Sequence, residues 1–353
     1  MDRSRKEPPA PEAPGEADDP LAAHLDRAWD LLERGELAAA RTAIDAALAE
    51  EPDSPEGITA LGAWAAASGE PDDALGHFER AMALAPDYID PFLQAAELLL
   101  YPLGEAEEAI ELCDAALEIA EEEQEYLDAL LLKAEAQLEL GEEDEARTTL
   151  GELPPTALPD AQLELRAGRL LLDVGELLGC ERHLRAALER SPELTDAVHG
   201  LALLAEARGD RAEMIRLFQE VREADLAEPP PQWGLTAERF DEVAHEALAA
   251  LPEPLRRRLG NVPILVSDYP SAALCQDGTD PRSLGLFAGV PFPEQATMGA
   301  SPHLEAVMLF SRNIERACRS ASEVEDETHK TLIHETAHFF GLSEEELEGL
   351  GLA

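Results

Sequence analysis

A glycine followed by an acidic residue recurs six times in the first two-thirds of the chain. The glycines are Gly35, Gly69, Gly104, Gly141, Gly175 and Gly209, which are separated by 34, 35, 37, 34 and 34 residues. A period of this length is typical of arrays of helix pairs, in which each pair buries its apolar surface against its neighbours. This repeat constrains the fold more than any other feature of the sequence.

The sizes of the side chains follow the same period. Small or soft residues stand five positions after each glycine, where two helices must approach closely: Ala40, Ala74, Ala109, Ala146, Cys180 and Met214. Residues nine positions after it, mostly bulky and apolar, are predicted to fill the space between helices: Ile44, Phe78, Cys113, Leu150, Leu184 and Phe218. Three prolines, Pro52, Pro86 and Pro192, are predicted to end second helices.

This pattern resembles the tetratricopeptide repeat over residues 21–226, as about six helix pairs that form an all-α solenoid. The third repeat departs from it, because one residue is inserted around Tyr101-Pro102-Leu103 and Glu121 replaces the closing proline. The resemblance implies that a protein or peptide partner binds on the concave face of the repeats.

The net charge of the chain limits the kinds of molecule that it is expected to bind. The chain has 27 basic and 75 acidic side chains, and its net charge of −48 opposes binding to nucleic acids and to anionic membranes. Residues 1–20 are acidic and rich in proline, with no apolar run, and are predicted to form a disordered tail. Without a secretory signal or a membrane-spanning segment, the expected location is the cytoplasm.

A second domain is predicted after a proline-rich linker at residues 227–235. Residues 236–353 are expected to form a small α+β domain. Helices are predicted at 236–251, 255–259 and 326–340, with strands at 262–266, 284–287 and 304–310. On the last helix, Ile333, Ala337 and Phe340 are expected to form the apolar face.

That last helix carries His334-Glu335-Thr336-Ala337-His338. Residues four apart lie one turn above each other, so two imidazoles can bind one Zn²⁺ ion while Glu335 acts as acid and base on a water molecule. A catalytic zinc needs a third ligand, and the spacing His-Glu-x-x-His-x-x-Gly-x-x-ligand places Glu344 there, after Gly341. Fifteen residues follow His338, which disfavours the thermolysin-type ligand on a later helix. Glu345 and Glu346 stay open as alternatives.

The domain resembles the minimal zincin-like metallopeptidases of bacteria, shortened relatives of the metzincins. The resemblance rests on the residues from Leu284 to Pro291, on the apolar strand before Ser311-Arg312, and on the histidine motif with Gly341. It implies that His334, His338 and Glu344 bind zinc and that Glu335 is catalytic. Metzincins have a third histidine and a methionine turn, whereas this chain has Glu344 and no methionine after His338.

Two functions follow from this combination. The first is a zinc metallopeptidase whose repeats recruit a protein substrate or partner. The alternative is a non-catalytic binding module in which the repeats act and the zinc site is vestigial or structural. Tyr269, the single tyrosine of the second domain, is a further candidate, for stabilising an oxyanion.

Overall fold

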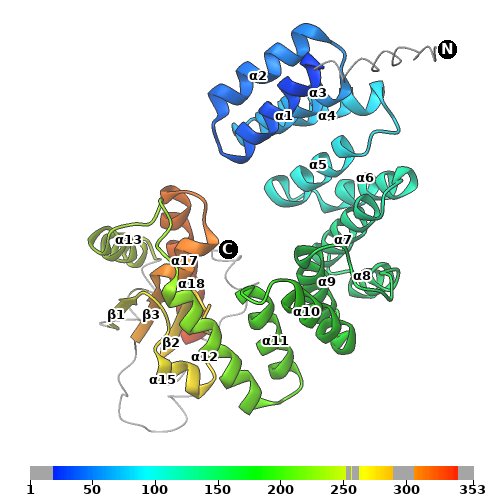
Figure 1. The fold of residues 1–353 in the computed structure, drawn as a ribbon. Coiled ribbons are helices and arrows are strands. Elements are labelled where there is room, and N and C mark those ends of the chain that lie inside the picture. The colour runs from blue at the N-terminus through cyan, green and yellow to red at the C-terminus, as the bar shows by residue number, and fades with distance from the viewer. Residues whose placement is uncertain (1–18, 252–255, 257–261, 289–305, 341–353) are drawn as a thin grey trace, which may run out of the picture. The chain divides into compact units, whose positions relative to one another are not determined.

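The computed structural model describes residues 19–251, 256, 262–288 and 306–340 (Figure 1). The chain divides into two compact units, residues 1–190 and 191–353. No helix in the described part of the chain is both long and apolar enough to cross a membrane. The predicted tail at 1–20 and the predicted helix at 255–259 fall almost entirely outside the described residues.

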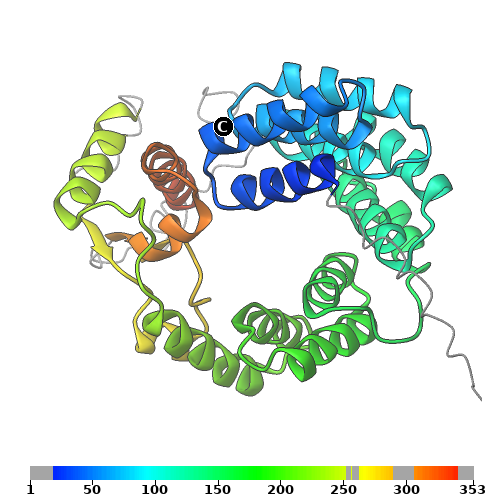
Figure 2. The ribbon, with the colours of Figure 1, turned by 45° about the horizontal axis from the view of Figure 1, so that its top comes forward.

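Unit 1 consists of successive antiparallel helix pairs, which Figure 2 shows from a second direction. Its elements are α1 (Pro20–Glu33), α2 (Leu37–Glu50), α3 (Pro55–Ala67), α4 (Pro71–Leu84), α5 (Asp90–Leu98), the π-helix η1 (Leu99–Leu103), α6 (Ala106–Ile119), α7 (Glu123–Glu139), α8 (Glu143–Leu150), α9 (Ala161–Asp173) and α10 (Leu177–Arg190). The expected solenoid of helix pairs is confirmed.

The repeat glycines end the first helix of each pair. All six have positive φ angles, between 69° and 77°, a backbone conformation that side chains with a Cβ disfavour. Two other glycines make room for the second helix. A Cβ on Gly62 would lie 2.5 Å from Phe78, and one on Gly168 would lie 2.8 Å from Leu184. The periodic size pattern therefore reflects real contacts between paired helices.

The irregular third repeat contains the π-helix η1. It continues α5 through Leu99–Leu103, includes Pro102, and ends at Gly104. The amide of Glu105 donates to the carbonyl of Leu99 over 2.9 Å. A π-helical turn holds one more residue than an α-helical turn, so η1 accommodates the insertion at Tyr101-Pro102-Leu103 that the sequence predicted.

Unit 2 contains the sixth helix pair and a small sheet. Its elements are α11 (Thr195–Ala207), α12 (Arg211–Ala227), α13 (Ala237–Ala250), β1 (Ile264–Ser267), α15 (Ala272–Asp277), β2 (Gly285–Ala288), β3 (Ala306–Phe310), α17 (Ser311–Ala317) and α18 (Ala321–Phe340). The strand order is β1-β3-β2, with β1 parallel and β2 antiparallel to β3. The predicted α+β domain is confirmed, and its three strands lie within three residues of their expected positions.

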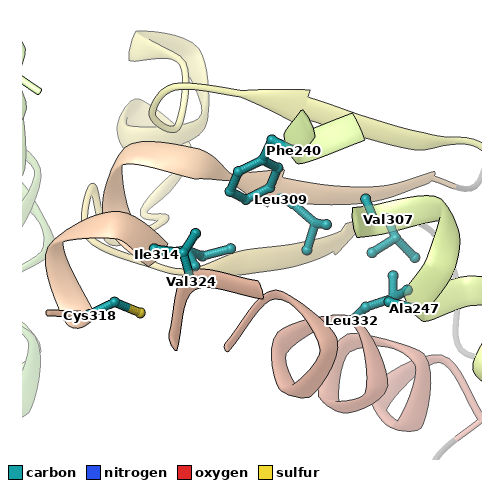
Figure 3. Packing of buried hydrophobic residues seen from close by; sticks show 9 residues of the cluster. Phe240, Ala247, Val307, Leu309, Ile314, Cys318, Val324 and Leu332 are labelled. Atoms are coloured by element: carbon teal, nitrogen blue, oxygen red, sulfur yellow. The ribbon is translucent and has the colours of Figure 1, made fainter. Parts of the chain in front are cut away.

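Helices α13 and α18 pack against each other and against the strands of this sheet (Figure 3). Thr236 caps α13, since its hydroxyl accepts from the amide of Arg239. The buried core joins both helices to β3 and α17 and consists of Phe240, Ala244, Ala247, Val307, Leu309, Ile314, Cys318, Val324 and Leu332. Burial raises the pKa of Cys318 to about 11, so its thiol stays protonated at neutral pH.

The sixth helix pair is fixed to the sheet domain by a buried ion network around Asp225 of α12. Asp225 has no exposed surface. Arg282 binds its carboxylate at both oxygens, over 3.0 and 3.1 Å, and Arg316 approaches to 2.9 Å. Because two guanidinium groups from the sheet domain share one carboxylate on α12, the helix pair and the domain form one structural unit.

The proline-rich segment at 227–235 is also held in place. The indole of Trp233 donates to the carbonyl of Glu315 over 3.1 Å, and the amide of Leu235 donates to the Glu315 carboxylate over 3.0 Å. Glu315 is buried, and Arg312 neutralises its charge. The segment therefore runs along α17 under specific contacts and is more than a spacer.

Candidate metal centre

Helix α18 carries the histidine motif and runs without interruption from Ala321 to Phe340. Its described buried side includes residues that the prediction did not name. Val324, Thr328, Leu332 and Thr336, each four residues from the next, are all at most 1 % exposed, whereas Ile333 is only partly buried. The side chains of Ala337 and Phe340 lie outside the described residues. Two of these four buried residues are threonines, and the Thr328 hydroxyl donates to the carbonyl of Val324 and so tolerates burial.

His334 lies on the outer side of α18. It is two residues from both Leu332 and Thr336, and two residues correspond to about 200° around a helix. The side chain is exposed. The helix is unbroken between positions 334 and 338, so the backbone places the two histidines one turn apart.

Glu335 points toward the sheet instead of solvent. Its Oε2 accepts a hydrogen bond of 2.8 Å from the amide of Phe287 in β2, and its side chain is partly buried. The amide of Phe310 donates to the carbonyl of Leu284, which fixes the alternation along β2. The peptide groups of Gly285 and Phe287 therefore face away from β3, on the side where Glu335 lies.

Gly285 allows this close approach of helix and strand. A Cβ at this position would lie 2.8 Å from Cγ of Glu335, 2.9 Å from Cγ2 of Thr331 and 3.1 Å from the carbonyl oxygen of Met308. All three distances are shorter than ordinary carbon contacts. The absent side chain is thus what permits Glu335 to reach the amide of Phe287.

The remaining predicted ligands are outside the described part of the chain. His338 lies in α18, but its side chain is not described, and Glu344, Glu345 and Glu346 fall beyond the described residues. Among the described residues, no group of three metal-binding side chains comes together. The described half of the motif fits a zinc centre in two respects: an exposed imidazole on a continuous helix, and an adjacent carboxylate held by a strand amide.

Tyr269 serves a structural purpose in place of the candidate catalytic one. Its hydroxyl donates to the main-chain carbonyl of Asp225 on α12 over 2.9 Å. Burial raises the pKa of Tyr269. The hydroxyl therefore joins the sixth helix pair to the domain and is directed away from an oxyanion role.

Sequence reasoning assigned no role to Gly285 or to the amide of Phe287. A glycine inside a strand is a recognised sign that another part of the chain comes close. That signal was present in the segment from Leu284 to Pro291. It could not show which side chain would approach, because Glu335 is fifty residues later in the sequence.

Models of known protein families match the repeat region and the C-terminal domain. Residues 259–352 match the zincin-like metallopeptidase family. Residues 58–91 and 100–167 match tetratricopeptide repeat families. No curated protein matches this sequence.

Solved structures resemble the repeat region. PilF of Pseudomonas aeruginosa is 16 % identical, with a TM-score of 0.50, and the match covers 60 % of this chain and 94 % of that one. A thermophilic tetratricopeptide repeat protein of Thermus thermophilus is 23 % identical over 53 % of this chain and 98 % of its own, with a TM-score of 0.42. At 16 % identity, the likeness to PilF shows a common fold only.

Proposed function

Because the chain joins tetratricopeptide repeats to a zincin-like metallopeptidase domain, we propose that it is a zinc-dependent metallopeptidase that hydrolyses peptide bonds. In this proposal the repeats bind a protein partner or substrate. The observation that carries it is the placement of Glu335, which is held by a strand amide beside an exposed histidine on the same helix.

The proposed roles follow from the chemistry of each side chain. His334, His338 and Glu344 would hold the zinc, which when bound supplies a Lewis acid that polarises the scissile carbonyl and lowers the pKa of water. The Glu335 carboxylate would accept the proton of the attacking water and return it to the leaving amine nitrogen. The hydrogen bond from Phe287 orients that carboxylate, so the proton acceptor is in place before substrate arrives.

The edge of β2 that faces away from β3 supports a peptide as the substrate. Among the described strands β2 is the last of the sheet, and its peptide groups at Gly285 and Phe287 face away from β3. The Phe287 amide is already bound to Glu335, so an added strand would pair through Gly285. An extended peptide can add to such an edge through main-chain hydrogen bonds. A peptide bound there would lie next to the proposed proton acceptor.

The repeats offer a polar surface for a partner along their first helices. Arg166 of α9 binds Glu135 of α7 through two hydrogen bonds of 2.7 and 2.6 Å, and the hydroxyl of Tyr101 in η1 reaches the same carboxylate. Glu97, one turn before Tyr101, lies close enough to this cluster that burial and the charge of Glu135 raise its pKa. We infer that the partner binds this side, the proposed concave face.

The amount of zinc bound to the purified protein tests the proposed metal site. Purified protein should contain about one zinc per chain, measured by mass spectrometry after dialysis. His338→Ala should lose the metal, because two remaining ligands hold zinc too weakly, and Glu344→Ala should weaken binding. His329→Ala is the matched control: it is on the same helix, and its Nδ1 already contacts the carbonyl of Glu325.

Measuring peptide hydrolysis distinguishes a metallopeptidase from a non-catalytic binding module. Glu335→Gln should retain zinc and lose hydrolysis of a peptide library, since an amide cannot accept the proton. Unchanged zinc in both the His338 and Glu344 variants would refute the metal site. Zinc bound with no hydrolysis by the unmodified protein would favour the non-catalytic binding module.

A further inference from the structure

A groove of about 470 Å³ lies between α4 and α6, the second helices of neighbouring repeats, with α5 at its floor. The apolar residues that line it are Leu75, Met82, Ala95, Leu99 and Leu112, and the acidic ones are Glu79, Glu107, Glu108 and Glu111. A volume of this size holds a few side chains of a bound molecule. Its acidic residues stand on both walls, Glu79 on α4 and the other three on α6.

The groove is separate from the first-helix surface described above. Ala95 of α5 and Leu99 of η1 face the groove. Glu97 lies two residues after Ala95, and Tyr101 lies two residues after Leu99. Two residues correspond to about 200° around a helix, so these pairs lie on opposite sides. A partner in the groove would therefore leave the cluster of Tyr101, Glu135 and Arg166 accessible.

The four glutamates have no ion-pair partner among the described residues, although other acids of unit 1 do. Arg80 on α4 pairs with Asp53 over 2.6 Å, and Lys133 on α7 pairs with Asp114 over the same distance. All four carboxylates of the groove are exposed. Four carboxylates without an ion-pair partner in the described part of the chain, arranged around an apolar floor, would attract the positive charges of another molecule.

The groove also coincides with the irregular repeat. Leu99 is both part of its floor and the first residue of η1. Two of its acids, Glu107 and Glu108, stand in the first turn of α6, the helix that follows η1 after two residues. π-Helical turns occur frequently at functional sites. The insertion is thus found at the place where the two acidic walls meet an apolar floor.

We propose that this groove binds an amphipathic helix of a partner protein, with an apolar stripe bordered on both sides by lysine or arginine. The apolar stripe would fill the floor through side chains at i, i+3, i+4 and i+7. The flanking cations would meet Glu79 on one wall and Glu107 and Glu111 on the other. Acidic residues on both walls favour a helix, because a helix presents cations on both sides of one stripe.

The test uses the full-length protein and three synthetic fluorescein-labelled peptides, followed by fluorescence anisotropy. The first peptide has leucines at helical spacing flanked by lysines and arginines. The second has the same composition in scrambled order, and the third replaces the leucines with serine. The first should bind at least tenfold more tightly than either of the others, because they lack the stripe or its apolar surface.

Charge variants locate the binding. Glu79→Gln/Glu111→Gln should weaken the first peptide about tenfold. The matched control Glu50→Gln/Glu118→Gln changes the net charge equally at exposed positions outside the groove and should change affinity less than threefold. Equal weakening in both double variants would overturn the proposal, since it would reveal attraction to net charge alone. Equal binding of the scrambled peptide, or no binding of the first peptide, would overturn it as well.

Discussion

The ion network around Asp225 allows a sharp test of how unit 2 is held together. Asp225→Asn keeps the size of the side chain and removes its charge. The change leaves Arg282, which is 14 % exposed, and Arg316, which is 30 % exposed, without their shared buried carboxylate. Removing one partner of a buried ion pair costs about 3–5 kcal/mol.

Two neighbouring acids reduce that cost. Arg282 also contacts Asp196, and Arg316 also contacts Glu228 over 2.7 Å. We therefore expect the lower end of the range, a loss of about 3 kcal/mol in the free energy of unfolding of unit 2. With a urea dependence of about 2 kcal/mol per molar, the unfolding midpoint should fall by about 1.5 M.

Tryptophan fluorescence can report on unit 2 alone. Trp29 and Trp64 belong to unit 1, and Trp233 belongs to unit 2. In a Trp29→Phe/Trp64→Phe background, a urea titration follows Trp233, whose indole contacts the carbonyl of Glu315.

The control lies on the same helix. Glu223 is exposed, two residues before Asp225, and Glu223→Gln should change stability by less than about 0.5 kcal/mol. An Asp225→Asn midpoint within 0.3 M urea of the unsubstituted protein, roughly the shift the control allows, would show that the network does not hold α12 to the domain.

Three further predictions also use urea titration, following Trp233 for unit 2 and, in a Trp233→Phe background, Trp29 and Trp64 for unit 1. Gly285→Ala should destabilise unit 2 by about 1–3 kcal/mol, because its Cβ would lie 2.8 Å from Glu335 Cγ; an unchanged Trp233 midpoint would contradict the packing. Gly62→Ala should cost unit 1 a similar amount, since the Cβ would lie 2.5 Å from Phe78, and the two tryptophans of unit 1 report this. Burial lowers the pKa of His183 below its ordinary 6.5, so the unfolded chain takes up the proton first and stability falls as the pH falls through 6.5. His183→Gln should lessen the loss of unit 1 stability between about pH 7 and 5.5, and an identical pH dependence in this variant would refute the assignment.

The repeat region was predictable because its contacts are local and periodic. Each glycine with positive φ ends a first helix, and each bulky residue such as Phe78 meets a small one such as Gly62 in the paired helix. Both partners lie within one repeat, so one sequence window contains the whole interaction. The insertion near Tyr101 was visible for the same reason, as a break in the period that the chain absorbs as η1.

The helix that carries the histidine motif was predicted in part. The spacing of His334 and His338 required only a helix, and α18 is one. The burial of Thr328 on that helix was not predicted, because its hydroxyl becomes compatible with burial only by bonding to the backbone carbonyl of Val324. Which polar residues become buried depends on the surfaces that α18 meets, and most of that surface comes from α13 and β2, which lie further away in sequence.

The ion network of Asp225 had no sequence signal at all. Its partners Arg282 and Arg316 lie fifty-seven and ninety-one residues further along the chain, and none of the three follows a recognisable motif. A sequence with 27 basic and 75 acidic residues offers many such pairings. Only the packing of α12 on the sheet domain selects this one.

That network changes where the zincin-like domain begins. The family match begins at residue 259, whereas the compact unit begins at residue 191. A fragment restricted to the matched residues would retain Arg282 and Arg316 without Asp225. The two partly buried guanidinium groups would then lose their shared carboxylate, and the fragment would be less stable. It would also lose the acceptor of the Tyr269 hydroxyl and the contacts of Trp233 and Leu235 with Glu315. The sixth helix pair, though built on the repeat pattern, is therefore energetically part of the metallopeptidase-like fold, and the position of β2 beneath Glu335 depends on a domain that begins at α11.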